Sequence, residues 1–265
     1  MRTMIDRSMP IGVMDSGVGG ISVLKKAVEI MPYEDFIYYG DSLNAPYGTK
    51  STEEIRDLTF AVVEKLRTTG IKALCVACNT ATAAAIKDLR AKYTDMPVIG
   101  IEPAVKPAAL STRGGTIIVM ATPMTITQNK FNELLKIYDK DARIIPLPCE
   151  GLMEMVEHWS DDKAPLMKYF DEKLGPVLQD DTETIVLGCT HYPFIKKELR
   201  EYLGDRDIAL IDGAEGTAKQ IRRRLEEEGL IRDKRHRGKV TMLNSSHDPA
   251  MIEISEKLFH MEIDE

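Results

Sequence analysis

The sequence predicts an α/β protein made of two related halves, each a parallel β-sheet with helices on both faces. Three observations predict this class. Short, β-rich apolar runs alternate with helical patterns along the chain, and the pattern that opens the chain begins again near residue 114. Two cysteine-containing segments, residues 74–90 and 185–200, are variations on one another.

Length and composition set the first limits. A chain of 265 residues is one large domain or two of ordinary size, and its 43% hydrophobic and 29% charged residues are typical of a globular protein. The net charge of −7 argues against a nucleic-acid partner, because neutralising phosphates requires a basic face. The N-terminus lacks the apolar core of a signal peptide, and no run approaches the ~20 residues of a membrane span. We therefore expect a cytoplasmic protein without membrane contact.

The first half alternates strands with helices. The glycine-rich turn after the first strand fits neither phosphate-binding glycine pattern, which disfavours nucleotide binding. A loop containing Pro46, Tyr47 and Gly48 precedes a helix at 52–68. The predicted strands are the apolar run that begins at Ile11 and has Asp15 and Ser16 at its end, residues 35–41, the apolar run before Cys78, and residues 96–104.

The second half repeats this order. The segment 114–135 aligns with the opening segment, so that Thr122 corresponds to Ser16 and Ala121 to Asp15. A second strand is predicted at 142–148, a helix at 149–159, and a solvated charged helical segment at 160–181. The strand that carries Cys189 follows, and then a helix at 193–203.

The remaining tail contains a strand at 207–213, a helix, a strand at 241–245 and a last amphipathic helix. We expect this tail to pack on the first half, because its strands would otherwise make the second sheet too large. The predicted domains are therefore 1–102 with 209–265, and 103–208. The basic run 234–239 is expected to form a solvated turn.

Both cysteine segments place a thiol where a strand ends and a helix begins. Asn79, Thr80 and Thr190 can cap these helices, and a thiol at a helix N-terminus is favoured as thiolate. Inverting a carbon centre needs one acid/base group on each face, and a free cysteine titrates near pH 8.5. Asp15 beside Cys78 and His191 after Cys189 can hold or exchange a proton with their neighbouring sulfurs.

Other roles for the cysteines are disfavoured. Cys75 and Cys78 could form a redox pair, and both together with Cys189 and His191 would count as four zinc ligands. Residues three apart in a strand point to opposite faces, however, so we expect neither arrangement. Cys75 and Cys149 are assigned to packing. Surface or capping positions are expected for the remaining histidines, which are His158, His236, His247 and His260.

The motifs DSGVGG, YYGDSLNAPYG, ACNTA and GCTHYP, in this order and spacing, resemble those of the glutamate racemases, the cofactor-independent branch of the aspartate/glutamate racemase superfamily. The resemblance runs from about Ile11 to the C-terminal helix. It implies two pseudo-symmetric, doubly wound (flavodoxin-like) domains with the active site in the cleft between them. It also implies a homodimer that interconverts L- and D-glutamate for peptidoglycan biosynthesis without cofactor, metal or nucleotide.

The resemblance also implies roles for single residues. Cys78 takes the α-proton from D-glutamate and Cys189 takes it from L-glutamate, with Asp15 and His191 assisting. A further glutamate of the family matches Glu157, with Glu154 as the alternative. The expected substrate contacts are Asp15, Ser16, Pro46, Tyr47, Gly48, Asn79, Thr80, Thr122, Thr125, Thr190 and His191.

Two alternatives stay open at this point. An aspartate racemase or a related isomerase is the alternative within the superfamily, and a thiol redox or zinc-binding protein is the alternative of a different class. The segment LNSSHDP, residues 243–249, departs from the Thr-Ser-Gly-Asp-Pro pattern of the family, which affects the expected turn there but not the site.

Overall fold

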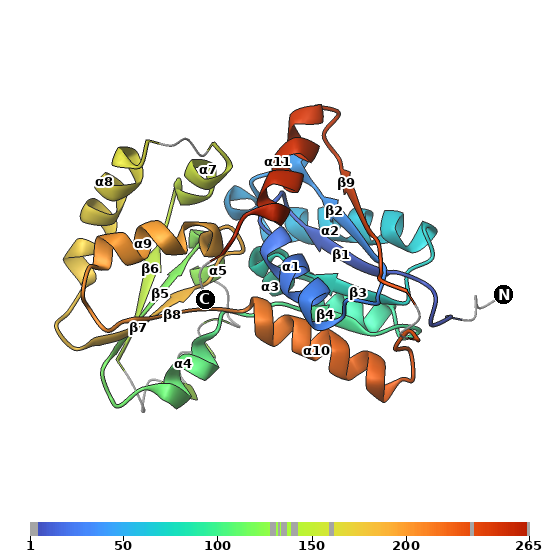
Figure 1. Ribbon diagram of the computed structural model, residues 1–265, viewed down its shortest axis with the longest axis horizontal. Helices are drawn as coiled ribbons and strands as arrows, with labels where there is room; N and C mark the ends of the chain where they lie inside the picture. The colour runs from blue at the N-terminus through green and yellow to red at the C-terminus, as the bar shows by residue number, and fades with distance from the viewer. Residues whose placement is uncertain are drawn as a thin grey trace. The chain divides into compact units, whose positions relative to one another are not determined.

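The computed structural model describes residues 5–127, 131, 133, 137, 138, 143–158, 162–233 and 236–263. The chain divides into two compact units (Figure 1). The first comprises Met1–Glu102 with Ala214–His260, and the second comprises Pro103–Gly213 with Met261–Glu265.

The described part of the first unit contains a parallel sheet of five strands in the order β4-β3-β1-β2-β9. Its central strands are continuous apolar runs, and every residue of β1 and β3 is buried. Such runs are typical of strands covered on both faces. The strands are β1 (Ile11–Asp15), β2 (Phe36–Gly40), β3 (Ala73–Val76), β4 (Val98–Gly100) and β9 (Val240–Asn244).

Helices cover both faces of this sheet, as right-handed crossovers on either side of β1 require. In Figure 1, α1 lies beside α10, and α2 packs with α3. The Ser51 side chain caps α2 by accepting a hydrogen bond from the Glu54 N–H at 3.2 Å. The helices are α1 (Ile21–Ile30), α2 (Thr52–Thr68), α3 (Asn79–Lys92), α10 (Ala214–Glu227) and α11 (Pro249–His260), with 3₁₀ turns η1 (Ser42–Asn44) and η2 (Tyr47–Thr49).

The second unit, over its described residues, has a parallel sheet of four strands in the order β6-β5-β7-β8. The strands are β5 (Thr116–Ala121), β6 (Arg143–Pro148), β7 (Thr182–Leu187) and β8 (Ala209–Asp212). The helical elements are α4 (Val105–Ser111), α5 (Pro123–Thr127), α7 (Leu152–Glu157), α8 (Ala164–Lys173), η3 (Gly175–Val177), η4 (Tyr192–Ile195) and α9 (Lys196–Leu203).

The two sheets share one strand order, which agrees with the repeat in the sequence. In the first sheet β1 lies between β2 and β3, and in the second β5 lies between β6 and β7. The strands that lead to Cys78 and Cys189, β3 and β7, therefore hold equivalent positions. The prediction of two parallel-sheet α/β halves is confirmed.

One predicted strand was assigned to the wrong half. The strand expected at 207–213 was placed with the first domain, but β8 pairs with β7 in the second sheet, with Leu210 opposite Ile185. β8 is the counterpart of β4, so the second sheet needs it to complete the repeat and is not oversized.

The rest of the tail does join the first sheet. β9 pairs with β2, and the backbone N–H of Arg232 donates to Glu34 Oε1 at 2.8 Å. Glu34 also forms a buried ion pair with Lys72, whose ammonium donates to the Arg7 carbonyl at 2.7 Å. This buried cluster ties the tail to the amino-terminal edge of the sheet.

Several element boundaries also differ from the predictions. The strand expected at 96–104 is limited to Val98–Gly100, and α4 was not anticipated. The charged segment 160–181 divides into α8 and η3. The predicted helix after β5 lies partly outside the described residues, as do parts of the predicted ranges 142–148, 149–159 and 160–181 and of the basic run 234–239.

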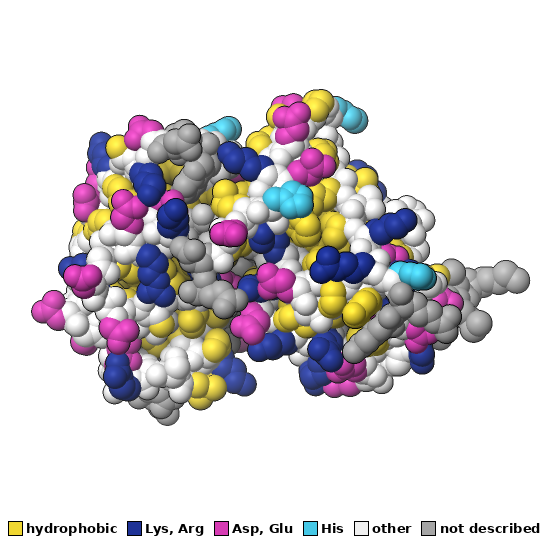
Figure 2. All heavy atoms as spheres, viewed as in Figure 1, with side chains coloured by type: hydrophobic (Ala, Val, Ile, Leu, Met, Phe, Trp, Pro, Cys, Tyr) yellow, Lys and Arg dark blue, Asp and Glu magenta, His cyan; other side chains and the backbone are white. Residues whose placement is uncertain are grey.

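The surface of each unit carries charges of both signs. On the face shown in Figure 2, lysines and arginines are interspersed with aspartates and glutamates. On α10, arginines pair with glutamates four residues later, as in Arg222 with Glu226 at 2.8 Å. None of the helices in the described residues combines the length and the apolar character needed to cross a membrane.

Candidate functional site

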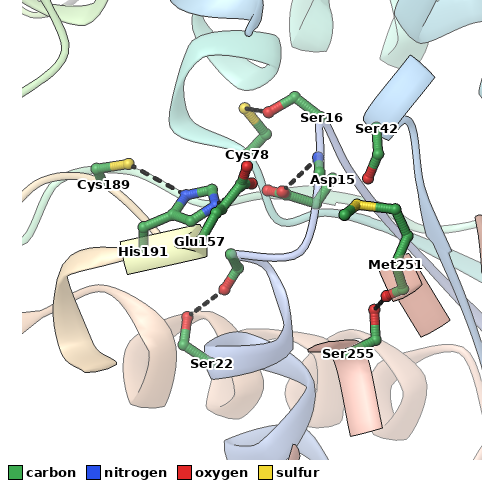
Figure 3. A network of polar contacts seen from close by, with 12 residues as sticks. Asp15, Ser16, Ser22, Ser42, Cys78, Glu157, Cys189, His191, Met251 and Ser255 are labelled. Carbon is green, nitrogen blue, oxygen red and sulfur yellow. Dashed lines mark hydrogen bonds and ion pairs between the residues drawn. The ribbon is translucent and has the colours of Figure 1, made fainter. Parts of the chain in front are cut away.

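The first unit brings a thiol and a hydroxyl together where β1 and β3 end. Cys78 is the N-cap of α3, and its Sγ accepts a hydrogen bond from the Ala81 N–H at 3.4 Å. Ser16 Oγ lies 3.3 Å from the same sulfur (Figure 3). Cys78 retains 5% exposure. The sulfur therefore has a backbone donor and a hydroxyl beside it, and both can stabilise a thiolate.

Asp15, the last residue of β1, is fully buried in the glycine-rich turn. Its Oδ2 accepts a hydrogen bond from the Gly17 N–H at 2.9 Å. A Cβ at Gly20 would lie 2.6 Å from the Asp15 Cβ and 3.0 Å from the Ala77 Cβ. The absence of a side chain at Gly20 thus lets the turn close around the aspartate.

The first turn of α3 contributes Asn79 and Thr80, which are 6% and 4% exposed. Among the described residues, Asn79 Oδ1 is buried and has no hydrogen-bond partner. A buried carbonyl oxygen without a donor is uncommon, because its lost hydration is not replaced. Next to the Cys78 thiol, such an oxygen is suited to accept a hydrogen bond from a bound ligand.

Tyr47 is held in place by an aspartate that the sequence analysis did not single out. The Tyr47 hydroxyl donates to Asp41 Oδ2 at 2.7 Å, and Asn44 Nδ2 donates to the same carboxylate. Burial, followed by the hydrogen bond to Asp41, raises the pKa of Tyr47, so its hydroxyl stays protonated. Asp41 follows β2 as Asp15 ends β1, and this parallel was a signal that could have identified it.

Tyr47 lies in a loop that contains a cis peptide bond and a 3₁₀ turn. The Ala45–Pro46 peptide bond is cis, and Tyr47 opens the 3₁₀ turn η2. Tyr47 is 1% exposed, whereas Pro46 and Gly48 are half-buried. All three expected contact residues therefore lie in this one turn.

The second unit aligns a thiol, an imidazole and a carboxylate in series. Cys189 Sγ lies 3.7 Å from His191 Nδ1, and His191 Nε2 lies 3.0 Å from Glu157 Oε1 (Figure 3). The chain brings them together from two places, because Cys189 and His191 lie between β7 and η4 while Glu157 ends α7. Cys189 is 8% exposed and His191 is 1% exposed.

His191 and Glu157 each favour the ionised form of the other. Burial alone favours neutral imidazole, but hydrogen bonds to Cys189 and Glu157 outweigh it and raise the pKa of His191 to about 10. Burial likewise opposes the ionised form of Glu157, yet the hydrogen bond and charge of His191 hold the pKa of Glu157 below its usual value. His191 is therefore protonated near neutral pH and lies between the Cys189 sulfur and the ionised Glu157 carboxylate.

Three threonines follow the central strands β5 and β7 of this sheet, with Thr125 inside the short helix α5. Thr122 follows β5, and its Oγ1 lies 3.0 Å from Thr125 Oγ1 and accepts from the Thr125 N–H at 3.3 Å. Thr190 is buried between Cys189 and His191. The predicted contact residues of this half thus follow β5 and β7, as Ser16 follows β1 and Asn79 and Thr80 follow β3 in the first unit.

The structure distinguishes the two candidate glutamates. Glu157 contacts His191, whereas Glu154 is exposed and lines a surface hollow with Met155 and His158 on the same helix. The prediction of surface positions for His158, His236, His247 and His260 is confirmed, since all four are exposed.

The two remaining cysteines lie in the core, as predicted. Cys75 is fully buried in β3 and Cys149 is 3% exposed, and burial raises the pKa of each thiol to about 12. None of the four cysteines, all of which lie in the described residues, forms a disulfide. Within the described ranges, no group of three or more histidine, cysteine or acidic side chains could hold a metal ion.

Comparisons with known proteins agree with one another. The model of the Asp/Glu/Hydantoin racemase family matches residues 11–221. The chain is 51% identical to the glutamate racemase of Clostridium acetobutylicum over 255 residues, covering 96% of this chain and 99% of that protein. It is 46% identical to the glutamate racemase of Clostridium perfringens, covering 96% and 98%.

Solved structures show the same similarity. A glutamate racemase isoform from Bacillus anthracis superposes with a TM-score of 0.86 at 33% identity, covering 97% of this chain and 96% of that one. A glutamate racemase from Francisella tularensis in complex with D-glutamate gives a TM-score of 0.83 at 28% identity, covering 97% and 95%.

Proposed function

This chain belongs to the Asp/Glu/Hydantoin racemase family, and we propose that it interconverts L- and D-glutamate with two cysteine sulfurs, one of which removes the α-proton while the other donates a proton to the opposite face. Relatives about half identical over nearly the whole chain are named glutamate racemases, and one solved relative holds D-glutamate. These similarities favour glutamate over aspartate as the substrate.

The proposed reaction is a balanced proton exchange. In the L-to-D direction, the Cys189 thiolate removes the α-proton of L-glutamate, and the C–H electron pair is delocalised into the adjoining carboxylate. The Cys78 thiol then gives its proton to the opposite face of the same carbon. D-Glutamate leaves with Cys189 as thiol and Cys78 as thiolate, and the D-to-L direction uses the reverse roles. Both sulfurs must therefore reach one carbon from opposite faces.

The observation that carries this proposal is the series from Cys189 through His191 to Glu157. A thiol is a weak base until a neighbouring cation stabilises its thiolate. Protonated His191 supplies that cation, and Glu157 keeps it protonated and oriented. Near neutral pH the second unit is thus prepared to remove a proton.

In the first unit, Ser16 and Asp15 assist Cys78, as His191 and Glu157 assist Cys189 in the second. The Ser16 hydroxyl can donate to Cys78 Sγ when the sulfur is a thiolate and accept from it when the sulfur is a thiol. Asp15 is buried at the same strand end, where its carboxylate can attract the substrate ammonium. Cys78 can therefore alternate between acid and base without a large change in its surroundings.

The substrate contacts suit a small dicarboxylate with one ammonium group. Asn79 Oδ1 has no donor among the described residues and can accept from that ammonium. The hydroxyls of Thr80, Thr122 and Thr190 can donate to the carboxylates. Asn79 and Thr80 follow Cys78 directly in the chain, Thr190 follows Cys189, and Thr122 follows the neighbouring strand β5.

The reaction is tested by incubating L- or D-glutamate with the protein in D₂O. We expect deuterium at the α-carbon and loss of optical rotation, with no cofactor added. Cys78→Ala and Cys189→Ala should each abolish racemisation. Full activity in both variants would exclude the proposed roles, and faster exchange of aspartate than of glutamate would favour the aspartate racemase alternative.

We further propose that the protein acts in the cytoplasm as a homodimer and supplies D-glutamate for peptidoglycan. Rescue of a bacterium that requires external D-glutamate tests the biological role, and sedimentation analysis tests the dimer. For the domain division, we propose that residues 1–102 with the tail after β8 carry Asp15 and Cys78, and that residues 103–213 carry Cys189 and His191.

A further inference from the structure

We infer that the Tyr192 hydroxyl is a positioning group for the acid–base series of the second unit, holding the Cys189 turn against the segment that leads to Glu157. Tyr192 is fully buried, and its hydroxyl donates to the Cys149 carbonyl at 3.2 Å. The inference rests on the proposed function and concerns a residue outside the set of catalytic and substrate-contact residues described above.

The end of β5 supports both segments that this hydrogen bond joins. The Gly188 N–H donates to the Met120 carbonyl at 2.7 Å, and the Cys149 N–H donates to the Ala121 carbonyl at 2.9 Å. Two successive carbonyls of β5 thus hold Gly188, which precedes Cys189, and Cys149, which begins the segment leading to α7. The hydrogen bond from the Tyr192 hydroxyl to the Cys149 carbonyl joins the same two segments a second time.

The glycine at position 188 shows how little free space this arrangement leaves. A Cβ there would lie 2.8 Å from the Met120 carbonyl oxygen and 3.1 Å from the Ala121 Cβ. The turn that follows is also closed, because the Tyr192 N–H donates to the Cys189 carbonyl at 3.1 Å. The position of Cys189 is therefore coupled to that of the Tyr192 ring.

The path from Cys149 to Glu157 is short and contains one sharp turn. Gly151 adopts φ of 79°, a conformation that favours glycine, and α7 begins at the next residue. Glu157 ends this helix and contacts His191. A shift of the Cys149 carbonyl would therefore be passed to Glu157 through a helix of six residues.

The direct test is Tyr192→Phe, which removes one oxygen atom and leaves the ring in the core. We expect kcat for glutamate racemisation to fall roughly tenfold while KM changes by less than about twofold, because the reacting groups are misplaced rather than the substrate contacts. The alkaline limb of the pH–rate profile should move to lower pH, because weaker contact with Glu157 leaves His191 easier to deprotonate.

A double-mutant cycle separates positioning from general stability. If Tyr192 acts through Glu157, then Tyr192→Phe in a Glu157→Gln background should cost less than about twofold in kcat. Additive losses, or an unchanged alkaline limb with only a lower melting temperature, would overturn the inference. Tyr93→Phe is the matched control: it removes a hydroxyl that donates to Glu64 at 2.6 Å in the first unit, and it should leave activity unchanged.

The titration of His191, followed by NMR on ¹⁵N-histidine-labelled protein, needs no substrate. Its pKa should fall in Tyr192→Phe and stay constant in Tyr93→Phe. Absence of racemisation in the unmodified protein would refute the proposed function while this titration still decides the role of Tyr192. An unchanged pKa of His191 in Tyr192→Phe would refute the positioning role of Tyr192 even if the protein racemises glutamate.

Discussion

His191 Nε2 lies 3.0 Å from Glu157 Oε1, although the two residues are 34 positions apart in the sequence. The imidazole is almost completely buried, and the glutamate side chain is 19% exposed. The contact leaves Nδ1 directed at the Cys189 sulfur. A buried imidazole held in this way acts as a fixed positive charge beside a sulfur, and its consequences can be measured.

Glu157→Gln should lower the pKa of His191 from about 10, because an amide cannot supply the negative charge that stabilises the imidazolium. We expect kcat in the L-to-D direction to fall roughly 10- to 100-fold, less than the ~10²–10⁴-fold typical of a group that transfers the proton itself, because Glu157 acts through His191. Steady-state kinetics in both directions checks this. An unchanged kcat in the L-to-D direction would show that the contact has no part in the reaction.

The stability of the protein should depend on pH through His191. Its pKa is about 10 in the folded protein and about 6.5 when unfolded, so folding is linked to proton uptake. The stabilisation is fully present below about pH 6.5 and is lost as the pH rises to about 10. Urea titrations between pH 6 and 10 should show this decline, and His191→Asn should flatten it. A parallel decline in the variant would contradict the assignment.

Asn79→Ala should separate stability from function. The buried Oδ1 has no partner among the described residues, so removing it takes away a desolvated polar atom and leaves the melting temperature unchanged or higher. The KM for glutamate should rise roughly tenfold, as expected for the loss of a charge-assisted hydrogen bond. Thermal melts and initial rates measure the two effects. A large fall in melting temperature with an unchanged KM would mean that Asn79 is structural.

Lys72→Met should destabilise the first unit without changing the chemistry. The change leaves Glu34 buried without its cation, which costs about 3–5 kcal/mol in comparable buried pairs. Adding Glu34→Leu should recover much of the loss, although the Arg232 N–H then loses its acceptor. Urea unfolding gives the free energies, and kcat of the folded protein should stay constant because the pair lies at the opposite strand ends from Cys78. Equal stability of the single and double variants would contradict this account.

Much of the fold could be predicted because its signals are local. β1 and β3 are short apolar runs, and α2 begins at a serine cap and ends where predicted. The repeat of strand, turn and helix was visible as similar segments at similar spacing. It predicted two related sheets, with Cys78 and Cys189 at equivalent strand ends.

Some contacts could not be predicted, because they join segments far apart in the chain. Glu154 and Glu157 lie nearly one turn apart on the same helix, so their spacing could not decide which one reaches His191. The hydrogen bond from Tyr47 to Asp41 depends on a 3₁₀ turn, and that from Tyr192 to Cys149 depends on how two loops pack. The sequence pattern predicts neither the 3₁₀ turn nor the packing of the two loops.

Local signals in the sequence were enough to predict two parallel-sheet halves with one thiol at a strand end in each, because strand, cap and helix signals act over a few residues. The tertiary structure decided that β8 completes the second sheet and that Glu157 supports His191. It also decided that Asn79 Oδ1 stays without a partner among the described residues. Strand pairing and side-chain contact depend on packing between distant segments, where burial and hydrogen bonding of the whole fold select one arrangement.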